Sequence, residues 1–128
     1  MSEAGHPVDP ERVEVVRQRG LQPGEADAMA RLLALMADPL RSRILAALLV
    51  SDEVCVGDLA IALDASEDAV SYALRLLRVA RLVRRRREGR MGYYRLQEGP
   101  AGEELEGVLS HLQALSAIHV VADTDEEH

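Results

Sequence analysis

The chain concentrates its positive charge in one short segment that is suited to binding phosphate groups. Nine of its fifteen arginines lie between Ser71 and Leu96, where Glu88 is the one acid, so this segment carries a charge of about +8. The remaining six arginines stand against twenty-one acids, and the net charge of the chain is −7. Guanidinium groups bind phosphate through paired hydrogen bonds, and the local field decides where a polyanion binds. The segment therefore predicts a polyanion site, and a helix followed by a hairpin suits duplex DNA.

Two helices and a tight turn are predicted to position the first part of this segment. Apolar spacing indicates a short helix over 56–63, then a longer helix that begins after the N-cap residue Ser66 and ends near Arg81. This pattern, over 56–81, is a helix-turn-helix, whose second helix enters the major groove of DNA. The residues that we expect to face DNA are Asp68, Ser71, Tyr72, Arg75 and Arg78. Asp68 has a second interpretation, because an acid at a helix start also stabilises the helix dipole.

A β-hairpin is predicted to position the second part of the segment. Two strand-like runs, 82–87 and 91–96, flank a turn in which Gly89 can adopt a positive φ. We expect this hairpin, residues 82–97, to act as a wing that contacts phosphates or the adjacent minor groove. Its candidate DNA-binding residues are Arg84, Arg85, Arg86, Arg87 and Arg90. Two alternatives stay open: an arginine run also protects an exposed strand edge from aggregation, and Tyr93 and Tyr94 suit strand packing better than base stacking.

The remaining composition favours a small helical protein. The chain has 128 residues, of which 48% are hydrophobic and only 2% aromatic, so its core must be mostly aliphatic. We therefore expect one domain, mainly α with a small β-hairpin, of the winged helix-turn-helix type, with a core completed across a dimer interface. The predicted boundaries are a disordered arm at 1–10, the domain at 11–118 with a last helix at 101–118, and an acidic tail at 119–128.

Other classes of protein are disfavoured by the sequence. Cys55 is the single cysteine, so no disulfide forms within the chain and a cytoplasmic location is expected. No apolar run reaches about 18 residues, so we expect no membrane span. The chain offers neither a nucleophile–base pair nor a phosphate-cradling glycine loop, and we do not expect an enzyme.

Several short motifs together resemble the ArsR–SmtB family of winged-helix, metal-sensing repressors. They fall within about residues 29–113 and are Ala37-Asp38-Pro39 with Arg41 and Ile44-Leu45, Cys55 to Ala60, Ala69-Val70-Ser71, Leu74 to Leu77, and Glu88-Gly89-Arg90 with Tyr93-Tyr94. The resemblance implies a homodimer joined through the first and last helices. It also implies repression of a promoter through double-stranded operator DNA, and release of that DNA when an effector binds.

The resemblance further implies places where a metal ion would bind. One site of the family takes four ligands from the paired last helices, and here two of those positions hold Glu98 and His111 while Pro100 and Ala114 hold the others. A Cys-x-Cys site of the family is represented by Cys55 alone. Ligands that some members take from their termini correspond to His6, His119 and His128. Oxygen and nitrogen ligands favour nickel, cobalt or zinc. The alternatives are a small buried cysteine and solvated histidines.

Three functions follow as hypotheses from these observations. In the first, a metal ion releases a dimeric repressor from its operator. In the second, the same repressor has no metal switch and responds through oxidation of Cys55, through another ligand, or not at all. In the third, the chain is a helical dimerisation module whose arginine hairpin binds an acidic protein.

Overall fold

The computed structural model describes residues 5–126, with side chains described up to residue 119. The chain divides into two units, Met1–Ala34 and Leu35–His128. In the first unit, α1 (Pro10–Arg19) begins where the Asp9 carboxylate accepts a hydrogen bond of 3.1 Å from the backbone N–H of Arg12. Helix α1 therefore includes the last residue of the segment 1–10 that we expected to be disordered, because a capping Asp followed by Pro favours a helix start. Helix α2 (Pro23–Met36) follows.

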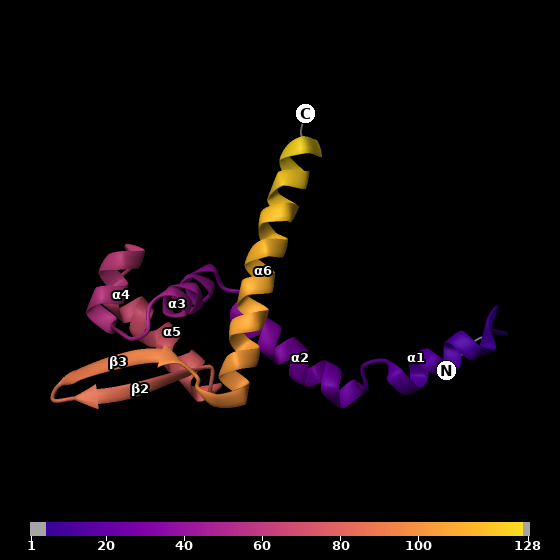
Figure 1. Ribbon diagram of the computed structural model, residues 1–128, viewed down its shortest axis with the longest axis horizontal. Helices are drawn as coiled ribbons and strands as arrows, with labels where there is room; N and C mark the ends of the chain where they lie inside the picture. The colour runs from indigo at the N-terminus through magenta and orange to yellow at the C-terminus, as the bar shows by residue number, and fades with distance from the viewer. Residues whose placement is uncertain (1–4, 127–128) are drawn as a thin grey trace. The chain divides into compact units, whose positions relative to one another are not determined.

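The second unit contains the predicted helix-turn-helix and hairpin (Figure 1). Its elements in chain order are α3 (Pro39–Val50), β1 (Val54–Cys55), α4 (Val56–Leu63), α5 (Glu67–Val79), β2 (Val83–Glu88), β3 (Met91–Leu96) and α6 (Gly99–Glu126). The strands form an antiparallel sheet in the order β1-β3-β2. The two-residue strand β1 was not predicted, because a strand this short has no recognisable alternation of side chains.

An aliphatic core holds the helix-turn-helix against the sheet. Its fully buried side chains come from α3, α4, α5 and β2 and are Ile44, Leu45, Leu59, Val70, Leu74, Leu77 and Val83. Tyr94 and Leu96 of β3 and Leu105 and Leu109 of α6 complete this core. Because both ends of the hairpin carry core residues, the base of the wing is fixed to the body of the unit.

Helix α6 is longer than the sequence indicated. We expected a helix over 101–118 and a separate acidic tail from 119, but the helix runs from Gly99 to Glu126. No Gly or Pro occurs between Gly107 and the end of the chain, so nothing in the sequence stops the helix at 118. His128 lies outside the described residues. No described helix combines the length and the apolar character needed to cross a membrane.

Candidate nucleic-acid interface

The first part of the interface is the exposed face of α5. The Ser66 hydroxyl accepts a hydrogen bond of 3.1 Å from the backbone N–H of Ala69, as its N-cap position predicts. The apolar face of α5 is buried, which leaves Ser71, Tyr72 and Arg75 exposed on the opposite face. The Arg75 guanidinium lies 5.3 Å from the centre of the Tyr72 ring, within cation–π range. The aromatic ring therefore restrains the arginine that we expect to contact a base.

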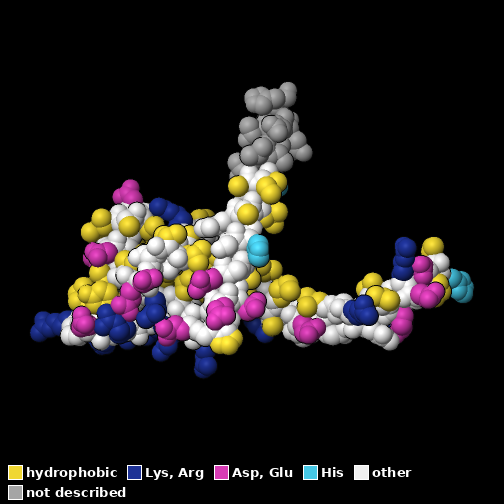
Figure 2. Space-filling model, viewed as in Figure 1, with side chains coloured by type: hydrophobic (Ala, Val, Ile, Leu, Met, Phe, Trp, Pro, Cys, Tyr) yellow, Lys and Arg dark blue, Asp and Glu magenta, His cyan; other side chains and the backbone are white. Residues whose placement is uncertain are grey.

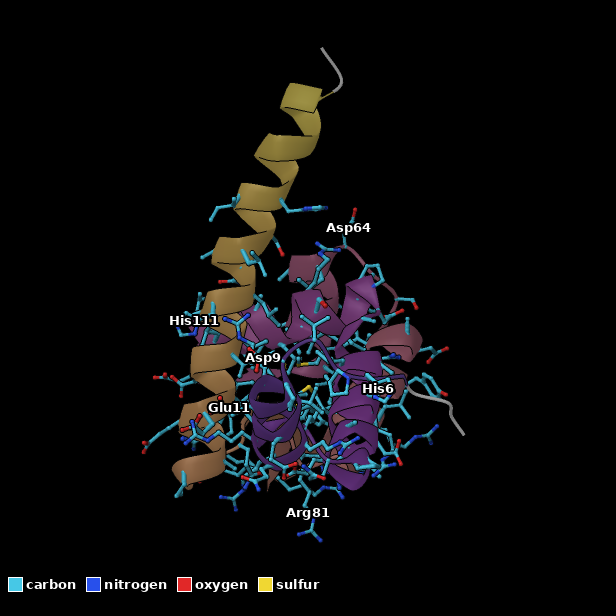
Figure 3. All side chains as sticks on the ribbon, turned by 90° about the vertical axis from the view of Figure 1, so that its right-hand side faces the viewer. His6, Asp9, Glu11, Asp64, Arg81 and His111 are labelled. Carbon is cyan, nitrogen blue, oxygen red and sulfur yellow. The ribbon has the colours of Figure 1, made fainter. Side chains whose placement is uncertain are left out.

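Each helix of the helix-turn-helix ends in a tight turn of the same type. Asp64 after α4 and Arg81 after α5 have φ values of +55° and +64°, in the left-handed region. At each end the backbone closes a pair of hydrogen bonds, from Asp64 to Ile61 and Ala65 to Ala60, and from Arg81 to Arg78 and Leu82 to Leu77. This pairing is the Schellman motif, which ends a helix sharply. Figure 3 shows the Arg81 side chain extending away from the body of the protein.

The pleat of the wing sorts its arginines onto two faces. Side chains alternate along β2, and in the register with β3 Arg84 lies opposite Arg95 and Arg86 lies opposite Tyr93. These four residues share one side of the sheet, which we call the outer face. Arg85 lies opposite Tyr94, whose ring is buried in the core beside α5, and Arg87 lies two residues further on the same side. We call that side the helix-facing side.

Carboxylates neutralise the arginines of the outer face. Arg86 donates two hydrogen bonds to Glu53, of 2.9 and 3.0 Å, and one of 3.2 Å to Glu88, and it lies 4.9 Å from the centre of the Tyr93 ring. The hydrogen bond from Arg86 holds the pKa of Glu53 below its ordinary value of 4.5. Arg84 and Arg95 both pair with Glu98, at 2.5 and 2.9 Å. The outer face therefore presents little net charge to a polyanion.

The helix-facing side keeps its positive charge. Arg85 and α5 line a hollow of about 380 Å³, whose walls are Asp68, Ser71, Tyr72, Arg75, Arg78, Arg85 and Tyr94. Within the described part of the chain, no carboxylate lies within 4.0 Å of Arg75, Arg78, Arg85, Arg87 or Arg90. Dark-blue arginine side chains gather along the edge formed by the hairpin (Figure 2). The arginines of α5, of the helix-facing side and of the turn are therefore unpaired among the described residues.

The residues proposed for a metal site do not fit the four-ligand arrangement that the resemblance implied. Both carboxylate oxygens of Glu98 are bound by guanidinium groups. His111 is exposed on α6 (Figure 3), and the positions of the other two ligands are Pro100 and Ala114, which have no donor atoms in their side chains. Cys55 is buried. In the described ranges no three His, Cys, Asp or Glu side chains gather in a way that would hold a metal ion.

A helix-turn-helix followed by a two-stranded wing with unpaired arginines defines a winged-helix DNA-binding protein. Comparison with known proteins identifies the family within this class. Residues 38–85 match the family described as bacterial regulatory protein, arsR family. The chain is 42% identical over 103 residues to the transcriptional repressor SmtB homolog of Synechocystis sp., a match that covers 80% of this chain and 77% of the relative. It belongs to the ArsR–SmtB family of transcriptional regulators.

Solved structures of related proteins have the same fold. The homodimeric winged helix-turn-helix DNA-binding domain of Mycobacterium bovis, described as a possible ArsR-family transcriptional regulator, superposes with a TM-score of 0.63 at 26% identity, and the match covers 91% of this chain and 93% of that domain. The antimony-specific transcriptional repressor AntR superposes with a TM-score of 0.62 at 31% identity, over 76% of this chain and 87% of AntR. The predicted family and fold class are thereby confirmed.

Sequence reasoning missed the acids that divide the wing. Glu53 lies 33 residues before its partner Arg86 and Glu98 lies 14 residues after Arg84, so spacing along the chain does not reveal either pair. A usable signal was present in the strand pattern. Because alternate residues of a strand face opposite sides, a run of four arginines could not present all its side chains to one surface.

Proposed function

We propose that this chain is a dimeric transcriptional repressor that binds operator DNA with α5 and the helix-facing side of its wing. In this proposal Arg75 contacts a guanine in the major groove, where an arginine can bind both acceptors of that base. Ser71 and Tyr72 bind neighbouring phosphates or bases, while Arg85, Arg87 and Arg90 bind phosphates. The protein acts in the cytoplasm, the compartment that its single cysteine favours.

The observation that carries this proposal is the division of charge in the wing. Arginines that share a surface with α5 have no carboxylate partner among the described residues, whereas those of the outer face are paired. A wing that only protected a sheet edge would have no need for such a division. Unpaired guanidiniums beside a recognition helix are instead what counterion release on a phosphate backbone requires.

The dimer is supported by an exposed apolar face on α6. Val108, Leu112, Leu115 and Ile118 follow helical spacing, and Leu115 and Ile118 are 61% and 67% exposed. Hydrophobic side chains are visible along this helix in Figure 2. Exposed apolar stripes of this kind mark association surfaces. Sedimentation of the wild type and of Leu115→Glu tests the point, and we expect a dimer and a monomer respectively.

The DNA-binding proposal is tested with duplexes selected from a random pool by the wild-type protein. Fluorescence anisotropy should show that a selected duplex binds at least tenfold more tightly than a scrambled duplex of equal length. The same measurement with a polyglutamate peptide distinguishes the protein-binding module, which predicts equal affinity for both duplexes and salt-sensitive binding of the peptide. Equal affinity for the two duplexes would refute sequence-specific repression.

A second candidate function, response to a metal ion, is favoured by the names of the relatives. AntR is described as specific for antimony. In this chain the four-ligand set is incomplete, so we expect any metal site to use residues other than the Glu98–His111 pair. Titration of the protein–DNA complex with zinc, nickel and cobalt tests whether a metal ion releases the DNA. Release of DNA by any one of them supports metal response, and no change with all three favours a repressor with another effector or none.

A further inference from the structure

Glu98 connects both strands of the wing to the start of α6. It lies in the two-residue link between β3, which ends at Leu96, and α6, which begins at Gly99. Its Oε1 accepts a hydrogen bond of 2.5 Å from Nη1 of Arg84 in β2, and its Oε2 lies 2.9 Å from Nη2 of Arg95 in β3. A single carboxylate therefore bridges the two strands.

This bridge offsets an unfavourable pairing within the sheet. Arg84 and Arg95 are direct partners in the β2–β3 register, so their two positive charges lie side by side on the outer face. Like charges directly opposite each other on neighbouring strands are destabilising. Because Glu98 lies between the two guanidiniums, it removes that repulsion and fixes the direction of both side chains.

The backbone around Glu98 leaves little room for movement between the wing and α6. The N–H of Gln97 donates a hydrogen bond of 3.0 Å to the carbonyl oxygen of Leu82, at the other end of the hairpin. A Cβ atom at Gly102, in the first turn of α6, would lie 1.7 Å from the carbonyl oxygen of Gln97. The first turn of α6 thus lies directly against the base of the wing.

We propose that Glu98 is a positioning residue of the DNA interface, which acts through Arg84 and Arg95. It holds the hairpin so that Arg85 stays beside α5 and Arg87 stays on the helix-facing side, and it fixes this orientation relative to α6. The inference rests on the proposed function, since it assigns a role within the same interface. It also accounts for the misfit at the implied metal site, where the two oxygens of Glu98 are occupied by guanidiniums.

The test uses the sign of the effect of Glu98→Gln on DNA affinity. If Glu98 were only a surface acid, its removal would lower the repulsion of phosphate and strengthen binding. If it positions the wing, its removal weakens binding to the selected duplex, by roughly 2- to 5-fold on the scale of exposed ion pairs. The matched control is Glu103→Gln. Glu103 is exposed, lines a surface hollow at the start of α6 together with Glu98, and has no ion pair within the described part of the chain, so this variant should bind unchanged or more tightly.

A variant that lacks both arginines tests whether Glu98 acts through Arg84 and Arg95. In the Arg84→Gln/Arg95→Gln protein Glu98 has no partner, and adding Glu98→Gln should leave affinity unchanged or raise it. A loss of the same size as in the wild-type background would mean that Glu98 acts by another route, and it would overturn the inference. Thermal unfolding of each variant shows whether the fold is retained.

Zinc binding, followed by calorimetry without DNA, supplies an independent readout. Equal zinc affinity of the wild type and Glu98→Gln supports the positioning role, while a zinc affinity that falls in the variant assigns Glu98 to a metal site and overturns it. Failure of the proposed function would look different, since the wild type itself would then not discriminate the selected duplex. If the wild type discriminates and Glu98→Gln binds as tightly or more tightly, only the inference about Glu98 is wrong.

Discussion

Of two neighbouring arginines in the wing, Arg85 should contact a phosphate of DNA and Arg86 should not, and the variants Arg85→Ala and Arg86→Ala test this. Arg85 faces α5 and has no carboxylate partner among the described residues, so its guanidinium is available to a phosphate. Arg86 is held by Glu53 and Glu88 and stacks on Tyr93. To bind a phosphate it would have to give up these three contacts. We therefore expect Arg85→Ala to remove a phosphate contact and Arg86→Ala to remove none.

The size of the effect follows from counterion release. Each phosphate contact contributes about 0.9 to the slope of log K against log salt concentration, and a dimer with two wings loses about 1.8 when Arg85 is removed. Between 50 and 200 mM salt, the affinity of Arg85→Ala for the duplex should therefore fall roughly 12-fold less than the affinity of the wild type. Arg86→Ala should keep the wild-type slope and lower Tm, because the Glu53 contact is lost.

The assay is anisotropy of the selected duplex at a series of salt concentrations, with thermal unfolding of both variants. If Arg86→Ala lowered the slope as much as Arg85→Ala, the division of the wing into a paired and an unpaired side would not describe how it binds DNA.

Three further predictions concern base preference, pH and packing. Arg75→Ala should weaken binding to the selected duplex by about 1–3 kcal/mol and relax preference at one base pair of each half-site, whereas unchanged affinity would show that α5 is not the recognition helix. Glu53→Gln should lower Tm at neutral pH. Because the Arg86 hydrogen bond lowers the pKa of Glu53, the stabilisation is present above the ordinary value of 4.5 and is lost as pH falls through the lowered pKa. The unfolding curves of the wild type and of Glu53→Gln should therefore converge in acid. Gly102→Ala should lower the free energy of unfolding by about 1–3 kcal/mol in a denaturation assay, since its Cβ would meet the Gln97 carbonyl. In the same assay Gly107→Ala, in the same helix but with nothing within 4 Å of the added Cβ, should be neutral or stabilising.

The sequence was sufficient for the helix-turn-helix and the hairpin because their signals are local. The Ser66 cap, the apolar spacing of α5 and the glycine turn at Gly89 each lie within a few residues of the element that they define. The contacts of the wing are not local. Glu53 reaches Arg86 because β1 pairs with β3, and β1 is too short to be predicted. The length of α6 was predictable in principle, since its second half contains no residue that breaks a helix.

The two left-handed residues that end α4 and α5 make the stability of this fold adjustable by substitution. A residue other than glycine in that conformation costs roughly 1 kcal/mol, so glycine at either position should relieve strain. At Asp64 the relief would come without loss of a positive charge, and Asp64→Gly is a direct route to a more thermostable protein. At Arg81 the same substitution would remove one of the nine arginines of the basic segment. Selection for heat resistance would therefore act freely at the first helix end, whereas at the second it would reduce the positive charge of the basic segment.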